Sequence, residues 1–309
     1  NQVLDIVMGR FSQFPLITGV ASSPVVDQDG RIVTKNGFDE GTNTYLQLSE
    51  DLEGITVPQH PTDEEIEAAR DFALEPFVDF PFVDRSDKAH ALAALLTPLV
   101  RPTLPTSPML VFHGTDPGIG KGAMVDTIST IAFGVPAGQG TLSKSEEEIR
   151  KNLTASAIEG VTAKFYDEVE VLDSKELRKT VAGRYISDRV LGVSETVNLP
   201  NKMTIFIQGN NIDIDSDLAR RYIQIRISSD GPSPETRGGF KYELPDWAGE
   251  HRRELLTALL TLIRAWYDRG QPEAPKATNL NSFNEWQRVI GGILHLAGVE
   301  GFLEGLEEQ

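Results

Sequence analysis

The chain has 309 residues, of which 39% are hydrophobic and 24% charged, the composition of a soluble globular protein with one large or two modest domains. The absence of cysteine excludes disulfide bonds, thiol catalysis and cysteine-ligated zinc. The net charge of −17 excludes nucleic-acid binding through the overall field, so any DNA contact requires a local basic surface.

The first segments of the chain carry no residues that indicate chemistry. Residues 1–60 are expected to form a small β-rich lead-in, with a hairpin around Asp29 and Gly30 and a second pair of short strands after it. Residues 61–108 are expected to form a helical linker region with two helices. Thr62 is the predicted N-cap of the first helix, and Glu65 occupies the capping-box position.

Residues 109–123, MLVFHGTDPGIGKGA, predict a strand, a glycine-rich loop and the start of a helix. This is the context of a phosphate-binding loop, because glycines let backbone N–H groups point at phosphate oxygens and a helix N-terminus attracts anions. Lys121 would reach the β- and γ-phosphates, whereas Gly122 stands where a Mg²⁺-binding hydroxyl usually follows the lysine. The alternative is a glycine-rich turn with an incidental lysine. The candidate nucleotide-binding residues are Gly114, Thr115, Asp116, Pro117, Gly118, Ile119, Gly120, Lys121 and Gly122.

A second short strand, predicted over 161–168, ends in Asp167 and Glu168. Ligands of open α/β sheets bind at the carboxyl ends of the strands. Asp167 can hold Mg²⁺ through water, and Glu168 can orient an attacking water, with Glu170 as a second candidate for that role. The alternative is a pair of surface carboxylates.

Further polar candidates follow the next predicted strands. A β-hairpin is expected over 189–199, with its turn at 192–195, and a buried strand then ends at Asn210. Asn210 can hydrogen-bond the attacking water or the γ-phosphate, and the alternative is a simple turn. Arg220 and Arg221 are either a salt-bridged surface or charge-stabilising fingers that reach the γ-phosphate of a neighbouring subunit.

The end of the chain is expected to be helical. A loop rich in Gly, Pro and Ser at 231–239 is the predicted internal boundary. Helices are expected after it at 247–267 and at about 282–297. Helix 145–154 earlier in the chain is expected to be capped by Ser143.

The order of these motifs resembles that of an AAA+ ATPase. The segments that carry the resemblance are GTDPGIGKG, YDE, GNN and DLARR, together with the stretch LRKTVAGRYISDRVLGVSETVNLPNKMTIFIQGNN at 177–211. More narrowly, the chain is similar to superfamily 3 and poxvirus-type primase-helicases of viruses, plasmids and integrated elements. The resemblance implies an α/β fold with a central, mostly parallel sheet in an AAA+ P-loop core at 109–230, and a C-terminal helical subdomain at 240–309.

The resemblance also implies an activity and a set of partners. The chain would be a ring-forming helicase motor of a phage or mobile element, a homo-oligomer and specifically a hexamer, which hydrolyses Mg-ATP between subunits to move along single-stranded DNA. Lys121, Asp167, Glu168, Asn210 and Arg220 or Arg221 would take the catalytic roles, with Asp167 as the residue associated with Mg²⁺. Arg189 and Lys202 would contact DNA, although the predicted hairpin tip has no Lys or Arg, and Arg189 is also a further candidate for the site between subunits.

The resemblance also implies a cellular location and an upstream domain, and two alternative functions stay open. The chain would lie in the cytoplasm of a bacterial or archaeal host cell, without membrane contact, behind an upstream primase or DNA-binding domain. One alternative is an AAA+ ATPase that remodels or loads proteins without moving on DNA, which the acidic charge favours. The other is a nucleotide-binding structural module with little turnover, which Gly122 favours.

Overall fold

A central sheet of five parallel strands organises the computed structural model, which describes residues 16–116, 118–189, 196–228, 239–275, 280 and 282–304. Across the sheet the strands are β14 (Tyr222–Ile227), β6 (Met109–Gly114), β12 (Thr204–Asn210), β8 (Ala163–Asp167) and β7 (Gly140–Thr141). The predicted α/β fold with a mostly parallel central sheet is confirmed. Because every pair of neighbours is parallel, the carboxyl ends of all these strands share one edge.

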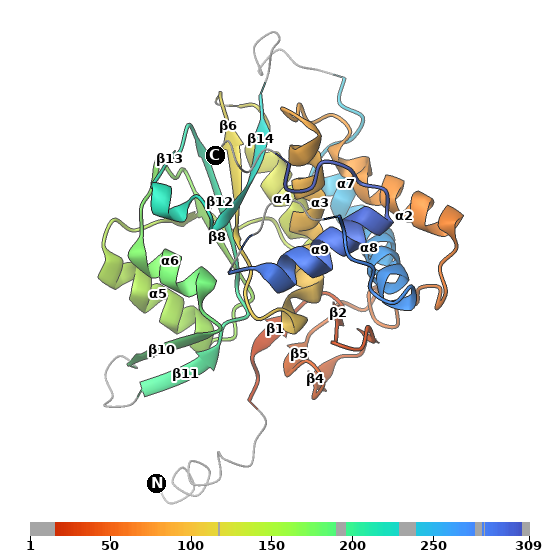
Figure 1. Ribbon diagram of the computed structural model, residues 1–309, viewed down its shortest axis with the longest axis horizontal. Coiled ribbons are helices and arrows are strands. Elements are labelled where there is room, and N and C mark those ends of the chain that lie inside the picture. The colour runs from red at the N-terminus through yellow and green to blue at the C-terminus, as the bar shows by residue number, and fades with distance from the viewer. Residues whose placement is uncertain are drawn as a thin grey trace, which may run out of the picture.

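Helices cover both sides of this sheet (Figure 1). On one side lie α3 (Arg85–Val100) and α4 (Lys121–Phe133), and on the other lie α5 (Glu146–Ile158) and α6 (Lys175–Ala182). The ring of Phe133 on α4 meets Phe165 at a centroid distance of 5.9 Å and Phe206 at 6.1 Å. Helix α4 therefore packs on the face of the sheet that carries these two phenylalanines.

The N-terminal segment contains the two hairpins expected from its turns. Strands β2 (Val25–Val26) and β3 (Ile32–Val33) are antiparallel, as are β4 (Gly37–Asp39) and β5 (Thr44–Leu46). Gly30 has a φ of 79° in the first turn, a conformation that favours glycine. The sequence did not predict that β1 (Gly19–Ala21) pairs in parallel with β5.

Helices from both ends of the chain pack together. Helix α2 (Asp63–Leu74) begins with the predicted capping box of Thr62 and Glu65, and it packs against α8 (Arg252–Asp268). Helix α3 contacts both α8 and α9 (Asn284–Leu296) and is buried around most of its circumference. The segments predicted as 61–108 and 240–309 thus share one helical layer.

Two local expectations were wrong. The helix predicted over 247–267 is two helices, α7 (Asp246–Glu250) and α8, because the backbone at His251 leaves the helical conformation. The break accompanies the burial of Arg252, whose guanidinium donates to Ile131 O and Ser22 O. Helix α5 is capped by Ser145, whose Oγ accepts from Glu148 N, and not by the Ser143 two residues earlier.

The remaining elements are short. They are β9 (Val171–Leu172), which pairs in parallel with β13 (Asp213–Ile214), the hairpin strands β10 (Tyr185–Arg189) and β11 (Thr196–Pro200), and the 3-10 turns Glu75–Phe77, Arg101–Thr103 and Ser216–Leu218. Among the described helices, none has the length and apolar character needed to cross a membrane.

Candidate nucleotide-binding site

The loop between β6 and α4 has the backbone geometry of an anion-binding turn. Gly118 and Gly120 have φ values of 77° and 106°, in the region that favours glycine, and Gly120 is the N-cap of α4. No side chain caps this helix, so the N–H groups of its first turn are not occupied by a capping side chain. The loop can therefore present backbone donors and the helix dipole to an anion. Pro117 lies outside the described residues.

Lys121 is directed across the sheet edge toward Asn210. Its Nζ donates to Asn210 Oδ1 at 2.5 Å, which joins the first residue of α4 to the end of β12. Gly114 permits this path, because a Cβ there would lie 2.8 Å from Lys121 Cδ. Burial lowers the pKa of Lys121, and the nearby charge of Asp167 raises it by less. The structure thus brings together Lys121, Asn210 and Asp167.

The acidic residues lie at the end of β8. Asp167 Oδ1 accepts a hydrogen bond of 2.6 Å from the N–H of Glu168, whose φ of 52° turns the chain sharply at this point. Glu168 and Glu170 are exposed. The carboxylate of Asp167 offers the kind of oxygen ligand that Mg²⁺ prefers. In nucleotide sites Mg²⁺ is usually held by one or two carboxylates, by phosphate oxygens of the nucleotide and by water. Among the described residues no group of three or more His, Cys, Asp or Glu could hold a metal. The site therefore fits Mg²⁺ only if nucleotide phosphates and water supply the other ligands.

Arg220 and Arg221 lie at the opposite end of the sheet from the loop. Met109 N donates to Arg221 O at 2.9 Å, so the two arginines flank the amino end of β6, about 16 Å from Gly114 at the usual rise per strand residue. Arg220 is exposed, and its side chain has no partner among the described residues. Arg221 bonds back to Asp217 O. Neither arginine is placed to reach a phosphate at Lys121 of the same chain.

The two predicted DNA contacts have different surroundings. Lys202 does not fit its expected role, because its Nζ donates to Pro102 O and Leu104 O at 2.8 and 3.1 Å. Burial, with the charge of Arg101, lowers the pKa of Lys202 to about 8. The predicted hairpin forms, but its first strand is β10, which ends at residue 189, where the hairpin was expected to begin. Arg189 is exposed at the end of β10, and residues 190–195, which include the predicted turn, lie outside the described residues.

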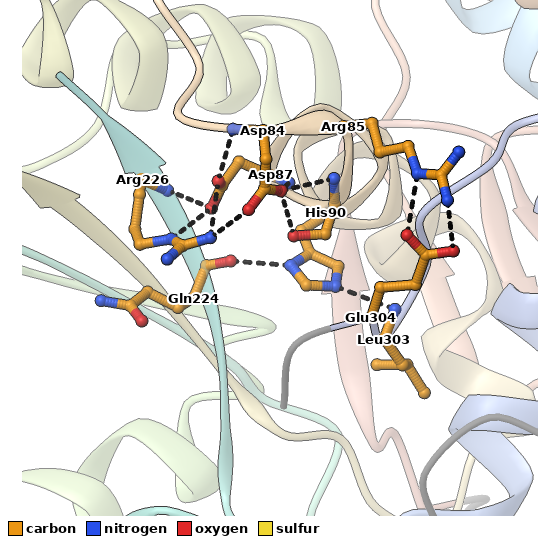
Figure 2. Close-up of polar contacts among 9 residues, drawn as sticks. Asp84, Arg85, Asp87, His90, Gln224, Arg226, Leu303 and Glu304 are labelled. Atoms are coloured by element: carbon orange, nitrogen blue, oxygen red, sulfur yellow. Dashed lines mark hydrogen bonds and ion pairs between the residues drawn. The ribbon is translucent and has the colours of Figure 1, made fainter. Parts of the chain in front are cut away.

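A polar network holds the segment before α3 against the loop. Figure 2 shows Arg226 of β14 bonded to Asp84 at 2.6 Å and to Asp87 at 3.1 Å. Burial raises the pKa of Asp87, and the hydrogen bond from Arg226 lowers it by less. Val83 N donates to Arg226 O at 3.2 Å, so residues 80–83 run along the end of β14. This places the half-buried ring of Phe80 against Gly120, where a Cβ would lie 3.3 Å from the ring.

Sequence reasoning missed several residues around the loop. Asn211 Nδ2 donates to Thr115 O at 3.4 Å. In the sequence, only its position next to the candidate Asn210 indicated that Asn211 lies near the site. No local sequence pattern indicates the contact of Phe80 with the loop. Asp126, half-buried on α4, and Gln208, buried in β12, were missed as well.

The sheet, the loop and the helix behind it make this chain an α/β protein with the architecture of a P-loop core. It is similar to an apo A-form structure of the NrS-1 C-terminal region, with a TM-score of 0.48 and 14% identity over 94% of this chain and 64% of that chain. A second NrS-1 C-terminal structure gives 0.39 and 12% over 80% and 55%. JCV helicase with a bound small molecule gives 0.31 and 11% over 76% and 68%. This chain thus spans less than two thirds of both NrS-1 chains. No protein-family model matches it, and no curated protein does.

Proposed function

We propose that this chain is an ATPase that binds Mg-ATP at the loop 114–122 and hydrolyses it between two copies of the chain. The observation that carries the proposal is the convergence of Lys121, Asn210 and Asp167 beside the uncapped N-terminus of α4. Three separate segments supply these side chains, and they meet at the carboxyl edge of a parallel sheet, where such folds bind ligands.

Each residue has a role that follows from its place. The N–H groups of the loop and Lys121 bind the phosphates, and Asp167 holds Mg²⁺, which neutralises charge on the phosphate oxygens. Glu168 orients the attacking water and accepts its proton, and the exposed Glu170 is the second candidate for this role. Asn210 holds Lys121 in position before the nucleotide binds and can hydrogen-bond the γ-phosphate afterwards.

A second copy supplies the arginine that stabilises the transition state. Arg220 is the better candidate than Arg221, because it is exposed and unpaired among the described residues while Arg221 bonds to its own chain. An exposed arginine far from its own phosphate loop can act only on the nucleotide of another subunit. A closed ring, such as a hexamer, gives every subunit this contact.

The motor function rests on the connection between the site and the hairpin. Strand β11 leads through three residues into β12, which ends at Asn210, so a change at the nucleotide can be transmitted to the hairpin. We propose that the hairpin, with Arg189 at the end of β10, moves single-stranded DNA through the ring as a helicase. In the same proposal the chain belongs to a replication protein of a phage or mobile element, in the cytoplasm of a bacterial or archaeal host, with a primase or DNA-binding domain upstream.

The second candidate is an ATPase that remodels or loads proteins. It is favoured by the net charge of −17 and by Lys202, whose ammonium group is taken up by backbone carbonyls. The two candidates share the nucleotide site and differ in their response to DNA.

Phosphate release with and without single-stranded DNA separates these candidates. A helicase motor should hydrolyse ATP several-fold faster with DNA, whereas a protein remodeller should show no stimulation. Lys121→Ala should lower turnover at least about a hundredfold, as removal of a charge-stabilising group does. Wild-type turnover in a folded Lys121→Ala variant would refute the site itself, and thermal unfolding of both proteins provides the folding control.

A further inference from the structure

Asp126 lies on the face of α4 that is turned toward the sheet. Gly122, Asp126 and Phe133 are separated by four and seven residues, so they share one face of the helix. Phe133 contacts Phe165 and Phe206, which shows that this face packs against β8 and β12. Asp126, half-buried, therefore lies between the phenylalanine contact and the phosphate loop.

The facing side of the sheet carries Asp167 and Gln208. Side chains alternate along a strand, so residues two positions after Phe165 and Phe206 are on the same face. They are Asp167 on β8 and Gln208 on β12, and Asn210 follows with the same alternation. The bond from Lys121 to Asn210 confirms that this face looks at the start of α4. Burial raises the pKa of Asp126, and the nearby charge of Asp167 raises it further.

Two oxygen atoms in this region lack hydrogen-bond partners among the described residues. Gln208 is 8% exposed, yet its Oε1 is buried and has no partner. Asp126 uses Oδ1 to accept from Ala137 N at 2.9 Å, which fixes the carboxylate and leaves Oδ2 unpaired. A buried amide oxygen without a partner carries a desolvation cost, which a bound cation or its water would offset.

Space is available above Asp126. A Cβ at Gly122 would meet no atom within 4 Å, so the position that usually bears the Mg²⁺-binding hydroxyl is open. Asp126 lies one turn further along the same face, and a carboxylate reaches further than a hydroxyl on the neighbouring turn. Mg²⁺ in nucleotide sites is held by one or two carboxylates, phosphate oxygens and several waters.

We propose that Asp126 and Asp167 together hold the Mg²⁺ that accompanies the nucleotide, Asp126 replacing the hydroxyl that Gly122 lacks, with Gln208 accepting a hydrogen bond from a metal-bound water. The inference rests on the proposed nucleotide site and adds the residue that completes its metal ligation. It explains why the loop tolerates glycine after the lysine.

The test measures binding and not turnover. The affinity for a fluorescent, non-hydrolysable ATP analogue is measured in EDTA and at saturating Mg²⁺, and the ratio of the two affinities reports the coupling between metal and nucleotide. Asp126→Asn retains an oxygen for Ala137 N, so the fold should persist, and the ratio should fall about tenfold or more. The control Asp213→Asn removes an exposed charge beside the acidic turn and should change the ratio less than about twofold.

A rescue variant separates ligation from a general loss of charge. Serine fits at position 122, so Gly122→Ser in the Asp126→Asn background should restore most of the lost coupling. Unchanged coupling in Asp126→Asn, or failure of serine to rescue it, would overturn the inference while leaving the nucleotide site intact. Failure of the wild-type chain to bind the analogue, with or without Mg²⁺, would overturn the proposed function as well.

Discussion

His90 shows how a single buried residue joins three segments of this molecule. Its Nδ1 donates to Gln224 O at 2.7 Å, and its Nε2 accepts from Leu303 N at 3.2 Å (Figure 2). This pair of bonds requires the neutral ring with the proton on Nδ1. The ring is 1% exposed, and burial lowers its pKa to about 4. A second proton, on Nε2, would face the N–H of Leu303 and break the contact with the C-terminal segment.

The stability of the protein should therefore fall on mild acidification. The folded pKa of about 4 lies below the ordinary value of 6.5, so between these values the unfolded chain binds the extra proton and the folded chain does not. On lowering the pH from 7 to 5, protonation of His90 in the unfolded chain should reduce the free energy of unfolding by about 2 kcal/mol. Urea unfolding at both pH values measures it.

A variant that cannot titrate provides the comparison. His90→Gln should be less stable than the wild type at pH 7, because it loses one of the two bonds, yet it should lose less stability on acidification. Other titratable groups, including Asp87, whose pKa burial raises, are present in both proteins and should affect both alike. Equal acid losses in the two proteins would contradict the assignment.

At the scale of elements, Gly209 governs how β12 meets the acidic turn after β8. A Cβ at Gly209 would overlap the carbonyl oxygen of Val169, whose N–H bonds to Gln208 O at 3.1 Å. This close approach of two backbones sets the ends of the strands that carry Asn210 and Asp167.

Substitution of Gly209 should therefore disturb both stability and nucleotide binding. Gly209→Ala should lower the free energy of unfolding by about 2 kcal/mol or more, because the backbone and not a flexible side chain must move. It should also weaken binding of the ATP analogue. Gly138→Ala is the matched control, since a Cβ there meets no atom within 4 Å, and it should be close to neutral in both thermal unfolding and binding assays.

The elements that form the site were predictable because each has a strong local signal. Apolar runs gave the strands β6, β8 and β12, and the parallel arrangement implied that Lys121, Asp167 and Asn210 would meet at one edge. The capping box of α2 was likewise local. The hairpin before β12 was also predicted from its local pattern, although its first strand lies earlier than expected, at 185–189.

The rest depends on contacts between distant segments, which no local pattern specifies. Arg226 and Asp87 are separated by 139 residues, and the hydrogen bond between them helps to fix residues 80–83 along the end of β14. The sequence does not show that the ammonium group of Lys202, a predicted DNA contact, is hydrogen-bonded to Pro102 O and Leu104 O, which lie about 100 residues earlier in the chain. An aspartate within a helix such as Asp126 usually faces solvent, and only the packing of α4 shows that it faces the sheet.

At the scale of the whole molecule, the two halves of the proposed catalytic site lie at opposite ends of the sheet. Lys121 follows the carboxyl end of β6, and Arg220 precedes the amino end of β14, beside the start of β6. In the proposed site, a single chain would supply the groups that bind the nucleotide but not the arginine that completes the site. Activity should depend on association between copies, and Arg220→Ala should lower turnover about a thousandfold while leaving nucleotide affinity nearly unchanged.

The most direct test mixes two inactive variants. Lys121→Ala subunits cannot bind the phosphates but still offer Arg220, and Arg220→Ala subunits bind the nucleotide but offer no arginine. When the two are mixed, some contacts between subunits pair an intact Lys121 with an intact Arg220. Phosphate release by the mixture should then rise well above that of either variant alone. If mixing restores no turnover, or if Arg220→Ala alone hydrolyses ATP at the wild-type rate, the proposed site between subunits is wrong.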